Sequence, residues 1–212
     1  MGNDADVTED RLLDGRIVIR QPARGYRVNA DTLLLAAAIE TADGPILEAG
    51  CGVGAGLIAL ASRDPAAQLI GVERDAGYAR LARENVALNG CAARVRVETG
   101  DALAAEGIFA GIYFNPPYDQ TGEGRAPAEA RRSAYIAEES LETWIKALSN
   151  KLAGGGAMTL IHRARKLGDI LAALEGRLGG VEILPIRPRA KEAAKRVLVR
   201  ARKGSRAPLK LY

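Results

Sequence analysis

Cysteine and histidine are scarce in this 212-residue chain, which has only two cysteines and one histidine. Cys51 and Cys91 lie far apart and outside any Cys-x-x-Cys spacing, and His162 has no histidine neighbour. A structural zinc site needs four such ligands at short, regular spacings. The sequence therefore predicts no metal site, and we expect both cysteines to be free, buried thiols in a reducing compartment.

Long apolar runs are also missing. No run approaches the roughly 20 residues that a helix needs to cross a bilayer, and the N-terminus is polar and acidic, unlike a signal peptide. With 48% hydrophobic and 26% charged residues, the composition is that of an ordinary folded protein with one core. We expect a cytoplasmic protein, a monomer or weak dimer, with no membrane partner.

Basic residues gather near the C-terminal end of the chain, although the net charge is only +4. Between positions 187 and 210 they are Arg187, Arg189, Lys191, Lys195, Arg196, Arg200, Arg202, Lys203, Arg206 and Lys210, against the single acid Glu192. A stripe of this kind can neutralise phosphates. We therefore expect Arg189, Lys191, Lys195 and Arg196 to contact nucleic acid; the alternative is an edge strand protected by charge.

Segments with strand and helix character alternate along the chain. Strands are expected at 45–49, 68–73, 94–97, 108–114, 157–161, 181–186 and 196–201. Helices are expected at 31–41, 57–61, 76–88, 141–152 and 166–178, the fourth ended by the glycines at 154–156. The alternation predicts a doubly wound, Rossmann-like α/β fold with a seven-stranded, mostly parallel sheet. Residues 1–42, including a hairpin at 11–21, are expected to pack on a core formed by 43–212.

A glycine-rich turn follows the first core strand. Gly50, Gly52 and Gly54 alternate with other residues at this point, and glycines there allow a tight strand-to-helix turn and close backbone approach to a ligand. Glu48, at the end of the strand, is suited to a cationic group such as the ammonium of an amino acid. Taken alone, such a turn is also compatible with a purely structural role.

Acids at the next two strand ends indicate which kind of ligand the turn binds. Glu73 ends the second strand, where an acid can accept both hydroxyls of a ribose. Asp101, followed by Ala102 after the third strand, is expected to accept a hydrogen bond from an adenine amino group. Because acids repel phosphates, Glu48 and Glu73 favour S-adenosylmethionine, which carries a sulfonium and no phosphate, over a dinucleotide.

The segment Asn115-Pro116-Pro117-Tyr118 follows the fourth strand and is the most specific motif in the chain. Its two prolines remove backbone donors, which leaves the Asn115 side-chain oxygen and the Pro116 carbonyl as acceptors. Two acceptors can hold both hydrogens of a planar amino group, and Tyr118 offers a face on which the group can stack. The motif predicts methylation of an amino or amide nitrogen, which needs no strong base because the proton can leave to water afterwards.

The order of elements together with this motif resembles the class I methyltransferases. Within them, Asn115 to Tyr118 resembles the motif of the amino-methylating branch, which includes adenine N6, cytosine N4 and protein glutamine N5 methyltransferases. The resemblance implies one antiparallel strand in the sheet and S-adenosylmethionine as cofactor. It also implies that the three glycines cradle the cofactor, Glu73 its ribose and Asp101 its adenine.

Two further segments are similar to the tRNA (adenine-N6) methyltransferases that modify the adenine beside the anticodon of a valine tRNA. They are Gln21-Pro22-x-x-Gly25-Tyr26-Arg27-x-Asn29-x-Asp31-x-x-Leu34-Leu35 and Arg187-x-Arg189-Ala190-x-x-Ala193-x-x-Arg196-Val197-Leu198-Val199. This resemblance implies an enzyme acting on an unpaired adenine of the position-37 type in tRNA, or on another structured RNA with an unpaired adenine. Asn29 and Asp31 would then close over the methionine end of the cofactor, or else cap a helix.

The roles of several other side chains are less closely defined by the sequence. The polar loop after the motif contains Arg125, Arg131 and Arg132, which are expected to reach RNA phosphates or to be solvated. We expect His162 to be structural or exposed, and Trp144 to pack in the core.

Two other functions stay open from the sequence. One is a protein glutamine N5-methyltransferase acting on a release factor, although such enzymes carry a separate helical N-terminal domain and only about 40 residues precede the core here. The other is an RNA-binding module with a vestigial cofactor fold, against which the intact Glu73, Asn115 and Tyr118 argue.

Overall fold

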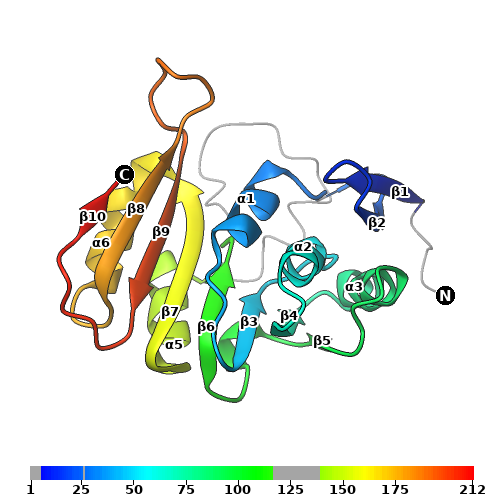
Figure 1. The fold of residues 1–212 in the computed structure, drawn as a ribbon, viewed down its shortest axis with the longest axis horizontal. Helices are drawn as coiled ribbons and strands as arrows, with labels where there is room; N and C mark the ends of the chain where they lie inside the picture. Colours follow the sequence, from blue (N-terminus) through cyan, green and yellow to red (C-terminus); the bar gives the residue numbers. More distant parts are fainter. Residues whose placement is uncertain (1–5, 26, 117–138) are drawn as a thin grey trace.

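The computed structural model describes residues 6–25, 27–116 and 139–212, and its ribbon is shown in Figure 1. The main sheet has eight strands in the order β10-β8-β9-β7-β6-β3-β4-β5. Along the chain these are β3 (Pro45–Ala49), β4 (Gln68–Glu73), β5 (Val95–Thr99), β6 (Phe109–Phe114), β7 (Leu152–Arg163), β8 (Gly179–Ile186), β9 (Arg196–Arg202) and β10 (Lys210–Leu211). A separate hairpin consists of β1 (Val7–Leu12) and β2 (Ile17–Pro22).

One strand of the main sheet runs against the others. β9 pairs antiparallel with both β7 and β8, whereas the remaining neighbours pair in parallel. The predicted α/β fold, mostly parallel with one antiparallel strand, is therefore confirmed. The short edge strand β10 is an eighth strand that the sequence did not indicate. Strand order reverses between β3 and β6, so the switch point at which open α/β sheets bind ligands lies at the carboxyl ends of these two strands.

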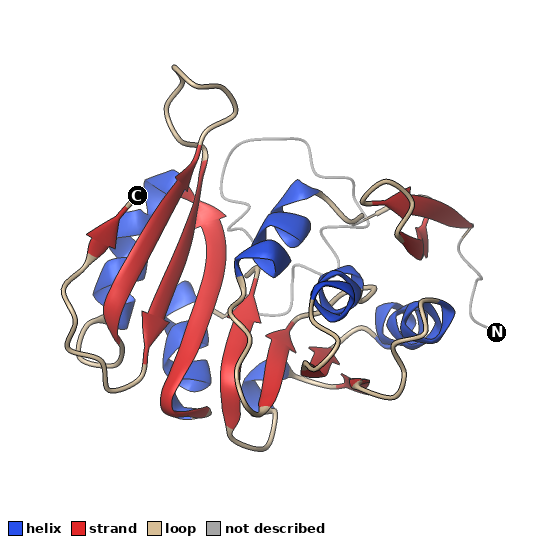
Figure 2. Ribbon diagram, viewed as in Figure 1, coloured by secondary structure: helices blue, strands red, loops and turns tan. Residues whose placement is uncertain are grey.

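Helices cover both faces of the sheet (Figures 1 and 2). They are α1 (Ala30–Ala38), α2 (Ala55–Arg63), α3 (Ala76–Leu88), α5 (Leu141–Asn150) and α6 (Leu167–Leu174), with short 3-10 turns at Ala102–Ala104 and Ala164–Lys166. Successive residues of a strand face opposite sides. Ile46 of β3 accordingly packs in a cluster with Leu35 of α1 and Leu57 of α2, whereas Leu47 packs in a second cluster with Ile145 of α5. The sheet thus separates two apolar layers.

The helix α1 and the hairpin pack in the apolar layer that contains Ile46 of β3. Ile17 and Ile19 of β2 have no exposed surface and belong to the same cluster as Leu35 and Ile46. The division into a segment 1–42 and a core 43–212 stays an interpretation.

Among the described residues, no helix has both the length and the apolar character needed to span a membrane.

Several expected boundaries match and one expectation is wrong. The strands at 45–49 and 68–73 and the helix at 76–88 have the predicted bounds. The glycines at 154–156, however, do not end a helix: α5 ends at Asn150, and the glycines lie inside β7. Gly155 has φ +76° and its N–H donates to the carbonyl of Lys203, so these glycines form an irregular start of a strand beside a register shift in β6.

Candidate active site at the carboxyl edge of the sheet

The three strands nearest the switch point end at the same level. Ala49, the last residue of β3, is paired with Val72 of β4 on one side and with Phe114 of β6 on the other. The residues that follow these three therefore form one row at the carboxyl edge: Gly50, Glu73 and Asn115. The structure thus brings together three residues that the sequence assigned to one site.

The glycine turn has a backbone that other residues rarely adopt. Gly50, Gly52 and Gly54 have φ values of +78°, +53° and +82°. Gly54 is also the first residue before α2, and a Cβ on it would lie 3.2 Å from the Cβ of Ala82 on α3. The turn therefore requires glycine both for its backbone conformation and for its packing against α3.

Glu73 is fixed beside this turn by backbone donors. Its Oε2 accepts a hydrogen bond from the N–H of Gly52 and its Oε1 accepts one from the N–H of Asp75, each at 2.9 Å. A carboxylate has about four acceptor positions, so both oxygens retain capacity for a pair of hydroxyls. The position fits the predicted ribose contact, which remains a prediction.

Asp101 lies one strand further along the same edge. Its Oδ1 accepts a hydrogen bond from the N–H of Leu103 at 2.9 Å and begins the 3-10 turn at Ala102. The side chain is exposed, whereas Ala102 is buried. Within the described ranges Oδ2 has no hydrogen-bond partner, so it is open to a ligand donor at this end of the row.

Glu48 lies deeper than the sequence suggested. Its side chain is buried under the first turn of α2, where Tyr113 donates a hydrogen bond to Oε2 at 3.0 Å and the N–H of Leu57 donates a second one. A Cβ on Gly56 would overlap this carboxylate. Burial, opposed by the two hydrogen bonds, raises the pKa of Glu48 to about 8. Glu48 therefore joins the first turn of α2 to β6, and its expected contact with a ligand ammonium stays a prediction.

Asn115 carries a buried acceptor. Its Oδ1 has no accessible surface and no hydrogen-bond partner within the part of the chain that the structure describes. Pro116 is buried beside it. An unsatisfied buried amide oxygen costs about 1–3 kcal/mol, which a donor on a bound molecule would recover. Pro117, Tyr118, Arg125, Arg131 and Arg132 lie outside the described residues.

An aromatic pair backs this part of the site. Trp144 of α5 stacks on Phe114 with ring centroids 5.5 Å apart and planes at 25°. A Cβ on Gly50 would lie 3.7 Å from the Trp144 ring. The predicted packing role of Trp144 is confirmed, and the ring lies against the glycine turn. His162, near the end of β7, is buried, which agrees with a structural role.

Asn29 and Asp31 both lie at the beginning of α1. Asn29 is its N-cap, because its side-chain oxygen accepts hydrogen bonds from the N–H groups of Asp31 and Thr32 at 2.9 and 3.4 Å. The Asp31 Oδ2 lies 2.7 Å from Nε of Arg196. The capping interpretation is thus observed for Asn29, and a cofactor contact of either residue stays a prediction.

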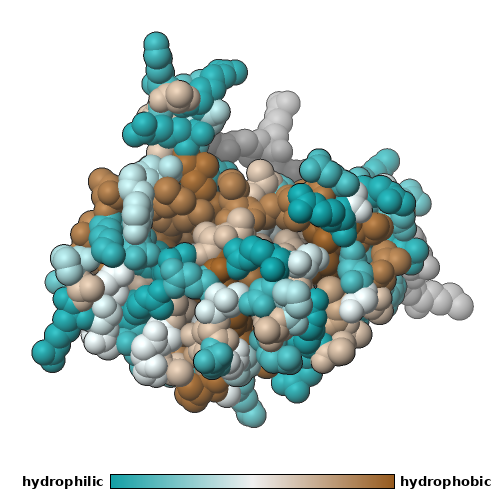
Figure 3. Space-filling model, viewed as in Figure 1, coloured by the Kyte–Doolittle hydropathy of each residue, from teal (hydrophilic) through white to brown (hydrophobic). Residues whose placement is uncertain are grey.

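The basic stripe divides into two parts. Because β8 runs parallel to β6 and β7, the loop 187–195 that follows it starts at the same edge as Asn115. This loop projects at the top of Figure 1 and has a hydrophilic surface in Figure 3. Arg189, Lys191 and Lys195 are exposed on it, Arg189 within 2.8 Å of Glu192. Further along β9, Arg200 and Arg202 form ion pairs within the protein, with Glu40 and Glu182 as partners.

A profile of the methyltransferase small domain family matches residues 25–185. The chain belongs to this family. The predicted methyltransferase resemblance is therefore confirmed.

Curated relatives of the chain carry a more specific name. A tRNA1(Val) (adenine(37)-N6)-methyltransferase of Actinobacillus succinogenes is 32% identical over 71% of this chain and 66% of the relative. A relative of the same name from Porphyromonas gingivalis is 32% identical over 85% of this chain and 76% of the relative. The aligned part of the chain thus spans about two thirds to three quarters of these relatives.

Solved structures agree on the fold. A structure described as a predicted O-methyltransferase from Agrobacterium tumefaciens has a TM-score of 0.69 and 31% identity, covering 85% of this chain and 84% of that one. A Thermus thermophilus 16S rRNA N2 G1207 methyltransferase, determined with AdoMet and guanosine, has a TM-score of 0.68 at 18% identity, covering 93% and 50%. At that identity the second likeness concerns the fold alone.

The C-terminal end of α1 is held by arginines from two other elements. The guanidinium of Arg63, the last residue of α2, donates to the carbonyls of Ala37 and Ile39, and Arg200 of β9 donates to the carbonyl of Ala38. These bonds satisfy carbonyls that the end of a helix leaves without intrahelical partners.

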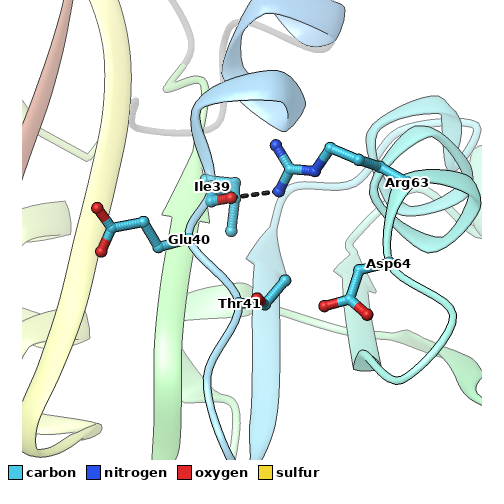
Figure 4. Close-up of a pocket in the computed structure, with 5 residues that line it drawn as sticks. All are labelled: Ile39, Glu40, Thr41, Arg63 and Asp64. Carbon is cyan, nitrogen blue, oxygen red and sulfur yellow. Dashed lines mark hydrogen bonds between the residues drawn. The ribbon is translucent and has the colours of Figure 1, made fainter.

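A hollow beside this helix end lies away from the candidate site. It has a volume of about 640 Å³ and is lined by Ile39, Glu40, Thr41, Arg63 and Asp64 (Figure 4). These residues precede β3 and β4, so the hollow lies toward the amino ends of the strands, opposite the glycine turn. Among the described residues, no group of three His, Cys, Asp or Glu side chains is placed to hold a metal ion.

Two buried polar residues near the site were missed by the sequence analysis. Tyr113 lies within an apolar strand, and only its hydroxyl distinguished it from a packing residue. Asn85 is a fully buried amide on α3, flanked by the apolar Ala82 and Val86. A polar residue on the apolar face of a helix is the signal that could have indicated it.

Proposed function

We propose that the chain transfers a methyl group from S-adenosylmethionine to N6 of an unpaired adenine in tRNA, of the position-37 type. The observation that carries this proposal is the Oδ1 of Asn115 at the carboxyl edge of the sheet, which is buried and has no hydrogen-bond partner among the described residues. The names of the curated relatives support both the adenine N6 and the tRNA. A cytoplasmic location and a monomer or weak dimer are part of the same proposal.

The cofactor fits the residues at the edge. The glycine turn presents backbone without side chains, and Glu73 and Asp101 lie in sequence along the next two strand ends. We assign Gly50, Gly52 and Gly54 to the cradle, Glu73 to the ribose, and Asp101 with Ala102 to the adenine, with Glu48 holding the first turn of the helix α2 that follows the cradle. When bound, the cofactor supplies an electrophilic methyl group on a positively charged sulfur, which suits an edge lined by acids.

The target nitrogen is held by acceptors alone. Asn115 Oδ1 accepts one hydrogen of the adenine amino group, and the Pro116 carbonyl is assigned the other. Holding both hydrogens draws the nitrogen lone pair out of the ring and toward the incoming methyl. Tyr118 is assigned to stack on the base. Attack of the nitrogen on the methyl group would form a nitrogen–carbon bond while the sulfur–methyl bond breaks and its electron pair stays on sulfur. The nitrogen would then release one proton to water, so no strong general base is required.

The RNA is recognised by charge around this pocket. Lys191 and Lys195 are exposed on the loop 187–195, which starts at the same edge as Asn115. Such cations neutralise phosphates on either side of a base placed in the pocket. An adenine in a loop is already unpaired, so extruding it costs less than flipping a base from a duplex.

The deciding experiment is methyl transfer from labelled S-adenosylmethionine to unmodified tRNA, followed by nucleoside analysis. We expect N6-methyladenosine. Asn115→Ala should abolish transfer while leaving cofactor affinity close to that of the wild type, because Asn115 contacts only the target nitrogen. Asn150→Ala, an exposed position at the end of α5, is the matched control and should retain activity. Label on a release factor instead of tRNA would contradict the substrate, and retained activity in Asn115→Ala would contradict the assigned role.

A further inference from the structure

One buried amide joins the N-terminal hairpin to the glycine turn. Asn85 of α3 has no exposed surface, and its Oδ1 accepts a hydrogen bond from the N–H of Arg20 at 2.8 Å. Its Nδ2 donates to the carbonyl oxygens of Arg20 and Val53, at 2.8 and 2.9 Å. Arg20 belongs to β2, whereas Val53 lies between Gly52 and Gly54. The three hydrogen bonds therefore connect two segments that are far apart in the sequence.

A second asparagine, one helical turn later, provides a natural comparison. Asn89 accepts a hydrogen bond from the N–H of Val18 at 2.9 Å and donates to the Val18 carbonyl at 2.7 Å. Four helical residues rise about 6 Å and two strand residues about 6.6 Å, so Asn85 and Asn89 match alternate residues of β2. Together the two amides pair with the edge of β2 as a neighbouring strand would. Only Asn85 also reaches the glycine turn.

The hydrogen bond from Asn85 to the Val53 carbonyl differs from the hydrogen bonds of the glycine turn that come from the side of β4. The N–H groups of Gly50 and Cys51 donate to the carbonyl of Val72, and that of Gly52 donates to Glu73. These bonds fix the first half of the turn from the side of β4. Asn85 holds the carbonyl of Val53 in the second half from the side of α3. Because Val53 is buried, losing this donor would leave an acceptor unsatisfied and free the turn to change shape.

From these contacts we infer that Asn85 is a positioning residue for the cofactor site, coupling the shape of the glycine turn to the seating of the hairpin. The inference rests on the proposed function only in taking the turn as the cofactor cradle. The hairpin leads through Arg27 to the cap of α1 at Asn29. Binding of the cofactor and docking of this N-terminal element therefore favour each other through one shared amide.

The test compares Asn85→Ala with Asn89→Ala in the full chain. Both variants lose hydrogen bonds to the hairpin and should have a lower Tm. Calorimetric titration with S-adenosylmethionine should show the Kd raised at least about tenfold in Asn85→Ala, as expected for one lost buried hydrogen bond, and little changed in Asn89→Ala. Equal Kd values for the two variants would overturn the inference, since Asn85 would then act only on the stability of the hairpin.

A second pair keeps the test decisive if the alanine variant does not fold. Asn85→Leu and Asn89→Leu preserve the shape of the side chain but remove the donors to the carbonyls. We expect the same contrast in Kd. A wild-type Kd in Asn85→Leu would contradict the role assigned to the donor.

Hydrogen exchange of the protein without cofactor separates this inference from the proposed function. Amides of the segment 50–57 should exchange faster in the Asn85 variants than in the Asn89 variants. If the wild type bound no S-adenosylmethionine, the proposed function would fail while this contrast would still support the positioning role. Equal protection of the segment in both pairs would overturn it.

Discussion

The Nε of Arg196, at the start of β9, lies 2.7 Å from Oδ2 of Asp31 in the first turn of α1. Only 31% and 13% of the two side chains are exposed, so water screens the pair less than it screens a surface ion pair. Asp31 also complements the positive end of the helix dipole. The sequence assigned Arg196 to nucleic acid and Asp31 to the cofactor, but the structure joins them to each other. Arg196 should therefore act mainly on stability.

Arg196→Ala is expected to lower the free energy of unfolding by about 1–3 kcal/mol, because it leaves the partly buried Asp31 without this partner. Urea denaturation of Arg196→Ala, Asp31→Ala and the double variant would measure the coupling between the two residues. The double variant should lose less stability than the sum of the single losses. Strict additivity would show that the pair contributes nothing.

Lys191 and Lys195 are expected to carry the RNA affinity of the loop 187–195. Replacing both by Glu should weaken tRNA binding and reduce the slope of log K against log salt by about 1 for each lost phosphate contact. Fluorescence anisotropy with unmodified tRNA at several salt concentrations measures this slope. Lys146→Glu, an exposed position on α5, makes the same charge change outside the loop and serves as control. A slope unchanged from the wild type would make the loop a solubility feature.

Stability should depend on pH through Glu48. Burial raises its pKa in the folded chain from 4.5 to about 8, so between these values the folded chain keeps a proton that the unfolded chain has released. The free energy of unfolding should therefore fall as the pH rises through this window, by at most about 1.4 kcal/mol per unit, and level off above it. Glu48→Gln does not titrate and should show a flatter profile. Denaturant titrations of both proteins across the window test this, and parallel profiles would refute it.

Gly54→Ala should both destabilise the fold and weaken cofactor binding. Alanine disfavours φ +82°, and its Cβ would lie 3.2 Å from Ala82, so a loss of about 1–3 kcal/mol is expected. Gly90→Ala is the matched control, because Gly90 also has a positive φ, +68°, but no atom within 4 Å of a Cβ. Gly90→Ala should lose stability without a change in cofactor Kd. Equal Kd values in calorimetry would separate the turn from the cofactor site.

The sequence predicted those features that depend on local pattern. The bounds of β3, β4 and α3 and the family follow from short apolar runs and from motifs whose residues are contiguous. Contacts between distant segments could not be predicted in this way. The side-chain amides of Asn85 and Asn89 form hydrogen bonds with the backbone of β2, which lies more than 60 residues earlier in the sequence.

The direction in which a side chain points could not be predicted from the sequence either. Glu48 lies at the end of its strand, as expected, but it faces Tyr113 and α2 because alternate residues of a buried strand face opposite layers. Likewise, the glycines at 154–156 carry the same conformational freedom in a helix stop as in an irregular strand. Pairing of Gly155 with Lys203 across the sheet decides between them.

Helix α1 is fastened to β9 at both ends, through Asp31 to Arg196 and through the carbonyl of Ala38 to Arg200. The four steps of strand between the arginines advance about 13 Å, and the seven steps of helix between their partners advance about 10 Å. The spacing of Arg196 and Arg200 along β9 thus accommodates the spacing of Asp31 and Ala38 along α1. Inserting one residue between Arg196 and Arg200 would turn one arginine to the opposite face of the sheet. Helix α1 therefore keeps both contacts only while the two arginines stay on one face of β9.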